Sequence, residues 1–387
     1  MTRIRNVDVA FAGGVLLGLA ALWLLGFFAL RDSEAFVHGN DFAFIWVGPA
    51  ALVHGAGPYD AATWPATTQA LGAQGTRVSV YDYPAWTTLA LLPLGALPLP
   101  VAAWIWAYGG LALVVGAMLV LIRDELETVP AAGLGLGIMT VASQPAIVNF
   151  YDGEWSCVML AAVVATILGF RGRREIVAAV GTLGLALKPN PFAIAFPALL
   201  RAGVARGDRR YLAIVLGAGA ASLVASLVLM PGWIASYAAL IQSERLASPK
   251  TTVLPFALRE VAGDLGLVVG VLVIVALVAA ALRFDPRSRA YVPAWLAVAP
   301  LVTPYLHSYD QLIVIAPVAV AIGALARRDR RLAYGLAAFA FLDLVVVAPL
   351  LIDKPALAIG RETLNAFILA PLAMLTLAAL WRDRRAA

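Results

Sequence analysis

Side chains that could do chemistry are confined to short polar segments between long apolar runs. These segments contain Asp41, Glu154 within Gly153-Glu154-Trp155-Ser156, Lys188 within Lys188-Pro189-Asn190-Pro191, and the cluster His307, Tyr309 and Asp310. A carboxylate can act as a general base, and a lysine is a compact cation that suits a phosphate group. These residue types could support base catalysis or phosphate binding, and each also has a structural interpretation.

Asp41 has two compatible interpretations. It comes directly before the apolar run that ends at Val53, where aspartate commonly caps the first turn of a helix. Alternatively, it is a base held at the membrane surface over a cavity. The spacing by itself favours the cap.

Lys188 is harder to explain by a structural role alone. A lysine within an apolar segment is costly unless it faces a partner or a cavity, and a lipid phosphate is a suitable partner. The alternative is a side chain that extends to the membrane interface, and the two interpretations carry equal weight.

The remaining polar residues also have simpler explanations. Tyr83 suits the aromatic belt of a membrane interface, and a surface turn explains Glu154. An isolated histidine is more often structural than catalytic, although Tyr309 and Asp310 beside His307 make a polar site plausible. Asp343, inside an apolar run, suits either a functional role or a buried hydrogen bond to another helix.

The composition shows which elements must position these side chains. Of the 387 residues, 62% are hydrophobic and 13% are charged, and the mean hydropathy is +0.88. Soluble domains have roughly 25% charged residues, so lipid must be the solvent for the apolar runs. We expect an all-α polytopic membrane protein with a single membrane domain over residues 1–387 and about 10–13 membrane segments. The expected ordinary spans are about 9–30, 101–122, 131–149, 155–170, 211–230, 266–282, 290–303, 308–325, 331–351 and 363–381.

The basic residues predict the sides of the membrane. Twenty of the 28 Lys and Arg residues lie in one set of connections and seven in the other, with Lys188 in neither. Because basic connections stay in the cytoplasm, both termini are expected there, and residues 31–83 form a long external loop with interfacial helices. Both flanks of residues 176–200 are then cytoplasmic. This segment is too short for two crossings, so we expect a Pro-broken hairpin with Lys188 near its tip, facing a cavity that opens outward.

Several classes of site have no sequence signature here. The single cysteine, Cys157, excludes an internal disulfide, and no phosphate-binding Gly-rich loop, His-x-x-x-His pair, Gly-x-Ser-x-Gly elbow or nucleic-acid module is present. We therefore expect no metal, no cofactor and no nucleic-acid partner.

Taken in order, the motifs resemble glycosyltransferase family 87 over about residues 36–320. The corresponding segments are Asp41-Phe42, Gly55 to Asp60, Tyr83-Pro84-Ala85, Gly153 to Ser156, Lys188 to Pro191, and Pro304-Tyr305 with Tyr309-Asp310. The resemblance implies a bundle of the C-type glycosyltransferase fold, similar to the phosphatidylinositol mannoside mannosyltransferases. It further implies inverting transfer of a mannose-like sugar from a polyprenyl-phosphate donor to a lipid or glycan acceptor, on the external side of the plasma (inner) membrane and among membrane lipids.

The resemblance also implies roles for individual residues. Asp41 inherits the role of catalytic base, and Lys188, with His307, stabilises charge on the departing phosphate. The other expected substrate-binding residues are Tyr83, Glu154, Asn190, Tyr309 and Asp310.

Departures from the family pattern leave alternatives open. Ala85 replaces a proline, Glu154 replaces a glutamine and Ser156 replaces an asparagine. These changes imply a different sugar or acceptor, or a loss of activity that would leave a scaffold. A transporter or flippase of a lipid-linked sugar is the main rival, although short basic cytoplasmic loops count against a second access route.

Overall fold

The computed structural model describes residues 5–26, 28, 31, 40–73, 80–247, 254–303, 306–349 and 365–384. Within these residues the chain is helical and has no strand, which confirms the predicted all-α class. Asp32, Glu34 and His38 of the predicted external loop, and the Pro304-Tyr305 pair of the family resemblance, fall outside the described residues.

Six stretches of the described chain are long and apolar enough to cross a membrane. They are α1 (Asn6–Leu24), α8 (Leu99–Glu125), α9 with α10 (Pro130–Ala142 and Gln144–Asp152), α14 (Arg209–Leu229), α16 (Leu254–Leu282) and η2 with α18 (Ser308–Val314 and Ile315–Ala326). Shorter apolar helices are α4 (Phe42–Val53), α11 (Ser156–Arg171), α12 (Glu175–Leu185), α17 (Tyr291–Val302) and part of α21 (Asn365–Arg384).

Several of the expected spans are shorter helices in the structure. The runs at 155–170 and 290–303 are helices of 16 and 12 residues, whereas a full crossing takes about 20 residues. The run that begins at 331 is α19 (Arg330–Phe341) followed by a π-helical segment, Leu342–Val347. An apolar run shows that a helix avoids water, and a short helix buried within the bundle satisfies that condition as well as a crossing does.

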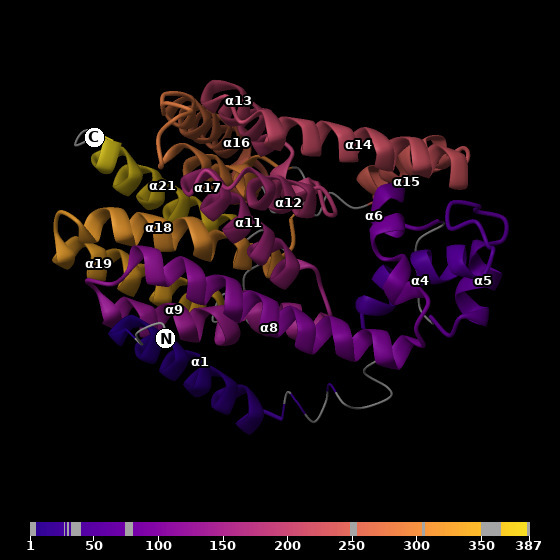
Figure 1. Cartoon of the computed structure of the whole chain (residues 1–387), viewed down its shortest axis with the longest axis horizontal. Coiled ribbons are helices and arrows are strands. Elements are labelled where there is room, and N and C mark those ends of the chain that lie inside the picture. Colours follow the sequence, from indigo (N-terminus) through magenta and orange to yellow (C-terminus); the bar gives the residue numbers. More distant parts are fainter. Residues whose placement is uncertain are drawn as a thin grey trace.

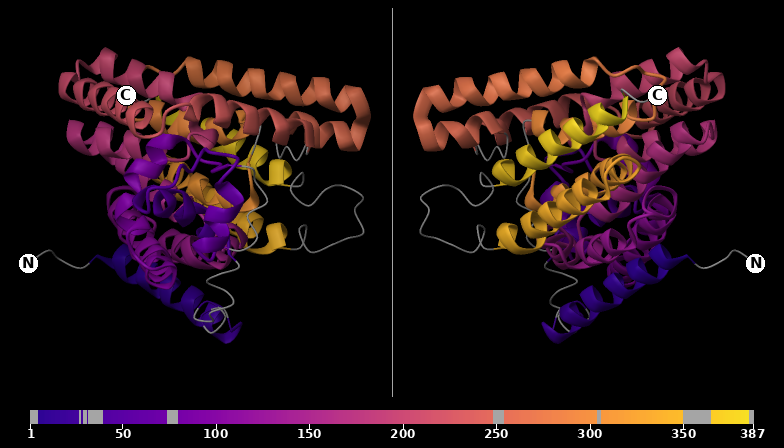
Figure 2. Two further views of the ribbon diagram at one scale, coloured as in Figure 1. Left: turned by 90° about the vertical axis from the view of Figure 1, so that its right-hand side faces the viewer. Right: turned by 90° about the vertical axis from the view of Figure 1, so that its left-hand side faces the viewer.

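The helices differ sharply in what they contact. All residues of α18 are buried, and most of α11 is too, so these helices lie in the core. In contrast, α14 has only Tyr211 and Ser226 buried. Figure 2 shows α16 along the upper edge of the molecule and α1 along the lower edge. Apolar side chains exposed on outer helices suit contact with lipid.

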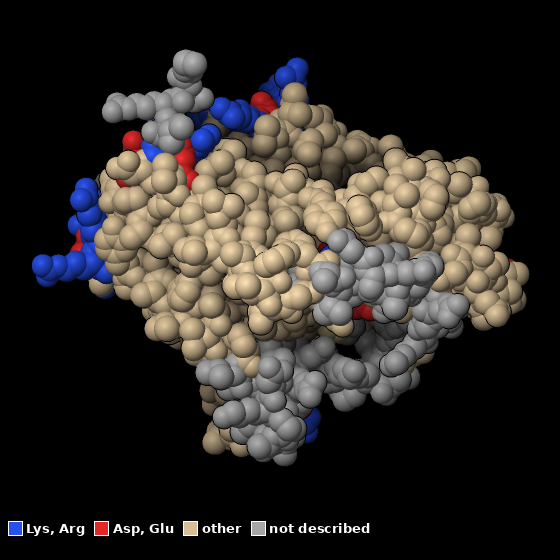
Figure 3. Space-filling view, turned by 90° about the horizontal axis from the view of Figure 1, so that it is seen from below, with Lys and Arg blue, Asp and Glu red and all other residues tan. Residues whose placement is uncertain are grey.

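The cytoplasmic connections predicted from the basic residues meet at one end of the bundle. Glu125, at the end of α8, forms ion pairs with Arg171 at the end of α11 and with Arg327 after α18. Close by, Arg123 pairs with Asp8 of α1 at 2.8 Å. Basic side chains gather at the left-hand end of the face in Figure 3, the same end at which α18 and α19 are joined in Figure 1.

Residues 175–206 form two helices with a break between them. After α12 come η1 (Asn190–Phe192) and α13 (Ala195–Arg206), and the Arg206 guanidinium donates a hydrogen bond to the Phe170 carbonyl at the end of α11. The chain thus returns to the end from which α12 started. The carbonyls freed at the break are satisfied by α6 (Ala85–Ala90), where Trp86 Nε1 and Thr87 Oγ1 donate to the carbonyls of residues 186 and 187, each at 2.8 Å.

Three short helices remain. They are α5 (Trp64–Ala70), α7 (Leu92–Gly95) and α15 (Trp233–Ala247). Figure 1 places α4, α5 and α6 together at the end away from the basic connections. Trp46 of α4 donates to the carbonyls of Leu94 and Leu97, each at 3.1 Å, and Tyr81 donates to the Ile45 carbonyl at 2.9 Å. These bonds fix the start of α4 against the bundle.

Candidate active site

Lys188 is enclosed by acidic and aromatic side chains. Its Nζ atom lies 2.8 Å from Asp310 Oδ1 and 3.8 Å from Glu154 Oε2, and 4.6 Å from the centre of the Tyr309 ring. Only 6% of the residue is exposed. The side chain therefore does not extend to the interface, and the carboxylates compensate for the cost of its burial.

Glu154 is positioned by the turn that joins α10 to α11. Gly153 has φ +76°, the left-handed conformation that ends α10. Trp106 Nε1 donates to the Gly153 carbonyl at 2.7 Å, and Asn149 Oδ1 accepts from the Ser156 amide at 2.7 Å. The turn is thus held from α8 and α10, and Glu154 is 5% exposed.

Asp41 reaches this site because α4 begins against the same turn. A Cβ atom on Gly153 would lie 2.7 Å from the Phe42 Cβ, so only glycine permits this approach. The carboxyl group of Asp41 lies near enough to Glu154, His307 and Lys188 for each of them to lower its pKa. Asp41 occupies the N-cap position of α4 but makes no capping hydrogen bond. The predicted cap was therefore wrong, because Glu154 lies within reach of the same side chain.

Burial and neighbouring charges shift the pKa values of the ionisable groups in this site. Burial raises the pKa of Asp41, and the carboxylate of Asp152 raises it further. Burial also raises the pKa of Glu154, against the opposing charge of Lys188. Neighbouring buried carboxyl groups disfavour charge on one another. Burial lowers the pKa of Lys188, but Asp310 and Glu154 more than offset this effect and the net shift is upward, so Lys188 stays charged.

The cluster at residues 307–310 closes another side of the site. The His307 amide donates to Asp310 Oδ2 at 3.1 Å, and the His307 ring stacks on Tyr309 with centres 5.0 Å apart. The charge of His307 lowers the pKa of both Asp41 and Glu154. His307 thus acts electrostatically on both acids and also shapes the start of η2.

The other two predicted residues differ in their placement. The Tyr83 ring lies 5.6 Å from that of Trp155, the residue that follows Glu154. It therefore belongs to the wall of the site. Asn190 is exposed at the start of η1, two residues beyond Lys188, and the structure does not bring its side chain into the cluster.

Two further acidic residues have no described contact with Lys188. Asp60 is exposed, and its carboxylate accepts hydrogen bonds from the Ala62 amide at 3.0 Å and the Thr63 hydroxyl at 2.8 Å. Asp343 is buried in the π-helical segment, and its Oδ2 atom has no hydrogen-bond partner within the described part of the chain. It is not joined to the site around Lys188 by a described contact.

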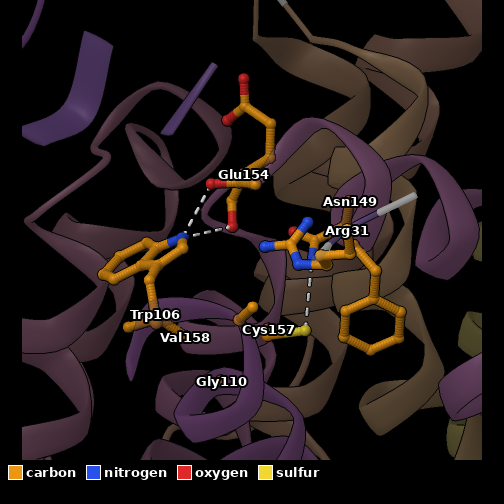
Figure 4. A pocket seen from close by; sticks show the side chains of 10 residues that line it. Arg31, Trp106, Gly110, Asn149, Glu154, Cys157 and Val158 are labelled. Carbon is orange, nitrogen blue, oxygen red and sulfur yellow. Dashed lines mark hydrogen bonds between the residues drawn. The ribbon is translucent and has the colours of Figure 1, made fainter. Parts of the chain in front are cut away.

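Sequence reasoning missed a pocket on the other side of the Glu154 turn. Arg31, Trp106, Asn149 and Cys157 line it together with Glu154. Figure 4 shows the Glu154 carboxyl group extending away from Cys157, while its backbone borders the pocket. Arg31 is 5% exposed and donates to the Tyr151 carbonyl at 3.4 Å. The sequence feature that could have indicated Arg31 was its position, since it is one of the seven basic residues on the predicted external side.

Comparison with known proteins identifies the family. The sequence profile of glycosyltransferase family 87 matches residues 81–304, more than half of the chain. The matched range includes Tyr83, Glu154 and Lys188, whereas Asp41 and Asp310 lie outside it. No curated protein and no solved structure shows significant similarity. The profile match, together with the membrane-spanning helices, shows that this chain belongs to glycosyltransferase family 87, a family of membrane glycosyltransferases.

Proposed function

We propose that the protein transfers a mannose-like sugar from a polyprenyl-phosphate donor to a hydroxyl group of a lipid or glycan acceptor. The observation that carries the proposal is the buried Lys188, paired with Asp310 and Glu154, with Asp41 near enough for Lys188 and Glu154 to act on its pKa. It brings a candidate base and a candidate phosphate ligand to one place. A phosphate is already a good leaving group, so the donor needs no nucleotide.

In the proposed reaction Asp41 removes the proton from the acceptor hydroxyl as its oxygen attacks the anomeric carbon. The bond from that carbon to the phosphate oxygen breaks, and polyprenyl phosphate leaves with the electron pair. A single displacement of this kind inverts the anomeric centre. Lys188, oriented by Asp310 and Tyr309, stabilises the charge that develops on the phosphate.

The two neighbouring acids support this division of roles. Burial raises the pKa of both, and a base must be unprotonated, so in this proposal Glu154 carries a proton while Asp41 accepts the one from the acceptor. Because its pKa is raised, Asp41 is a stronger base than an ordinary exposed aspartate. His307 and Tyr83 complete the substrate-facing wall in this proposal.

We infer the location of the reaction from the distribution of charge. The pairs formed by Glu125 with Arg171 and Arg327 mark the end that we assign to the cytoplasm. Asp41 and Glu154 lie with the connections at the opposite ends of the helices, so we assign the site to the external side of the plasma membrane, with both chain termini in the cytoplasm.

The direct test uses the purified full chain in lipid nanodiscs. Polyprenyl phosphates carrying different labelled sugars, mannose first, are offered with extracted membrane lipids or glycans as acceptors. We expect transfer from at least one of these donors, and a product whose anomeric configuration, read by NMR, is opposite to that of the donor. Absence of transfer from every polyprenyl-phosphate sugar, or retention of configuration, would contradict the proposal.

A further inference from the structure

Three connections on the side that we assign to the cytoplasm are joined by arginine hydrogen bonds. They link α11 to α12, α13 to α14, and α16 to α17. The Arg206 guanidinium donates to the Phe170 carbonyl of the first and, at 3.0 and 2.9 Å, to two carbonyls of the third. Arg287 Nε donates in return to the Ala205 carbonyl at 2.8 Å. Residues far apart in the chain thus form one surface.

The charges on this surface are strongly unbalanced. Its segments, 171–175, 206–210 and 283–289, hold nine arginines and three acidic residues. Glu175 and Asp285 each accept hydrogen bonds from backbone amides, so part of their charge is already used within the protein. Burial lowers the pKa of Arg206, Asp208 opposes this shift, and the like charge of Arg173 adds to it. An anion bound here would relieve the repulsion between these arginines.

Several of the arginines have side chains left over for a ligand. Arg173, Arg174 and Arg209 are exposed, and within the described part of the chain their side chains form no hydrogen bond or ion pair. A guanidinium group matches a phosphate with two parallel hydrogen bonds. The surface therefore suits a ligand that carries a phosphate.

Apolar side chains continue from this surface along two helices. Glu175, the first residue of α12, accepts from the Arg210 amide at the start of α14 at 2.7 Å, so the two helices begin side by side. On α12, Val180 is 60% exposed and Ile176 is 51% exposed, and on α14 Leu216 is 58% exposed. Cations followed by exposed apolar side chains match both parts of a phospholipid, whereas a free phosphate would use only the cations.

We propose that the arginines of these three connections bind the headgroup phosphate of an anionic phospholipid, whose acyl chain lies along the exposed faces of α12 and α14. Anionic headgroups are attracted to basic segments at the cytoplasmic surface of a membrane. The bound lipid would hold together the base of the α12–α13 hairpin, whose break carries Lys188. An effect on catalysis through Lys188 rests on the proposed function, whereas the binding itself requires no sugar donor.

The experiment measures lipid binding directly. The purified full chain in a neutral detergent is titrated with fluorescent phosphatidylglycerol, and separately with fluorescent phosphatidylcholine that has the same acyl chains. Glycerol phosphate serves as the soluble competitor. Arg173→Gln combined with Arg174→Gln removes two charges from the first connection, and Arg209→Gln removes one from the second. Arg328→Gln combined with Arg330→Gln is the matched control, because both residues are exposed on the same side, between α18 and α19.

The expected losses follow from the charge removed. A basic residue near an anionic headgroup contributes about fivefold to binding, so the first double substitution should weaken phosphatidylglycerol binding roughly 10- to 30-fold. Arg209→Gln should weaken it about fivefold and the control pair less than about twofold. Lysine at positions 173 and 174 should retain most of the affinity, and added salt should weaken it. If the first double variant misfolds, Arg209→Gln against the control pair still decides the outcome.

The outcomes separate this inference from the proposed function. Equal affinity for the two lipids, or equal losses in the cluster variants and the control pair, overturns the inference. Complete displacement of phosphatidylglycerol by glycerol phosphate also overturns it and makes the surface a site for a soluble phosphate compound. Because no sugar donor or acceptor is present, selective binding that depends on these arginines supports the inference even in a protein that transfers no sugar, a result that would remove only the transferase reaction.

Discussion

The ammonium group of Lys188 lies 2.8 Å from Oδ1 of Asp310, a residue 122 positions later in the chain. This contact joins the break between α12 and η1 to the start of η2. Glu154 adds the α10–α11 turn to the same cluster at 3.8 Å from Lys188. The site therefore depends on the relative placement of three separate segments, and perturbing any one of them should affect the others.

The first prediction concerns the energetic coupling of Lys188 and Asp310. Lys188→Met leaves two buried carboxyl groups without their cation, and breaking a buried pair typically costs about 3–5 kcal/mol. In an Asp310→Asn background the same substitution should cost less, with a coupling of roughly 0.5–3 kcal/mol between the two positions. The free energy of unfolding of the four variants, measured by denaturant titration in mixed micelles, gives this coupling. Strictly additive effects on the free energy of unfolding would show that the two side chains do not interact, contrary to what their short distance implies.

The second prediction concerns Gly153. Alanine there would be strained at φ +76° and would also contact Phe42 at 2.7 Å. Gly55 has the same φ, with nothing within 4 Å of an added Cβ. Gly55→Ala should therefore cost only the conformational strain, about 1–2 kcal/mol. Gly153→Ala should be less stable than Gly55→Ala and should also transfer sugar more slowly, because it displaces the start of α4 and hence Asp41. Thermal unfolding and initial rates test this, and matching effects in the two variants would show that the contact with α4 is unimportant.

The third prediction concerns pH. Burial raises the pKa of Asp41, and Asp152 raises it further. Since a base must be unprotonated, the rate should fall as the pH drops through this raised value. Asp152→Asn removes the second effect, so the acid limb of the kcat/KM profile should move to lower pH. Asp60→Asn, in an exposed turn, is the control and should not move it. If the acid limb of the kcat/KM profile stayed in place in Asp152→Asn, the ionisation that limits the rate would not be that of Asp41 beside Asp152.

The fourth prediction concerns the side of the membrane. In a Cys157→Ser background, a cysteine at the exposed Ala66 of α5 should react with an impermeant thiol reagent added outside intact cells. A cysteine at the exposed Arg328, next to the Glu125–Arg327 pair, should react only after the membrane is permeabilised. The reverse pattern would place the site in the cytoplasm and refute the proposed access to an external acceptor.

Sequence reasoning succeeded where a motif carries its own chemistry. The order of the motifs pointed to family 87, and the Pro-flanked Lys188 coincides with a break between helices. It did not establish contacts, because the distance between Lys188 and Asp310 depends on how distant helices pack. Asp41 shows the same limit. Its position before α4 predicts a cap, but its side chain makes no capping hydrogen bond and lies near Glu154, which belongs to another segment.

Other misses have equally physical causes. Hydropathy reports exclusion from water, so it did not reveal that α11 and α17 are short and largely buried. Arg31 was counted only for its sign of charge and its side. Its burial next to Glu154 arises from the packing of α8 and α10, which no local pattern in the sequence contains.

Asp41 is the residue on which the proposed reaction depends most, because it is the base. Asp41→Asn retains the shape of the side chain and cannot accept the proton. Because Asp41 makes no capping hydrogen bond, the substitution should not weaken α4. Asp60→Asn changes an exposed carboxylate in the same stretch of chain and is the matched control. Glu154 and Lys188 remain in place in both variants.

The decisive measurement is the single-turnover rate of labelled-sugar transfer from the polyprenyl-phosphate donor, with donor affinity and thermal stability measured on the same samples. General acid–base groups typically contribute about 10²–10⁴-fold. Asp41→Asn should therefore lose activity on that scale while its stability and donor affinity match those of the unmodified protein and of Asp60→Asn. Transfer by Asp41→Asn at a rate within a few-fold of the unmodified protein would contradict the assignment of Asp41 as the base.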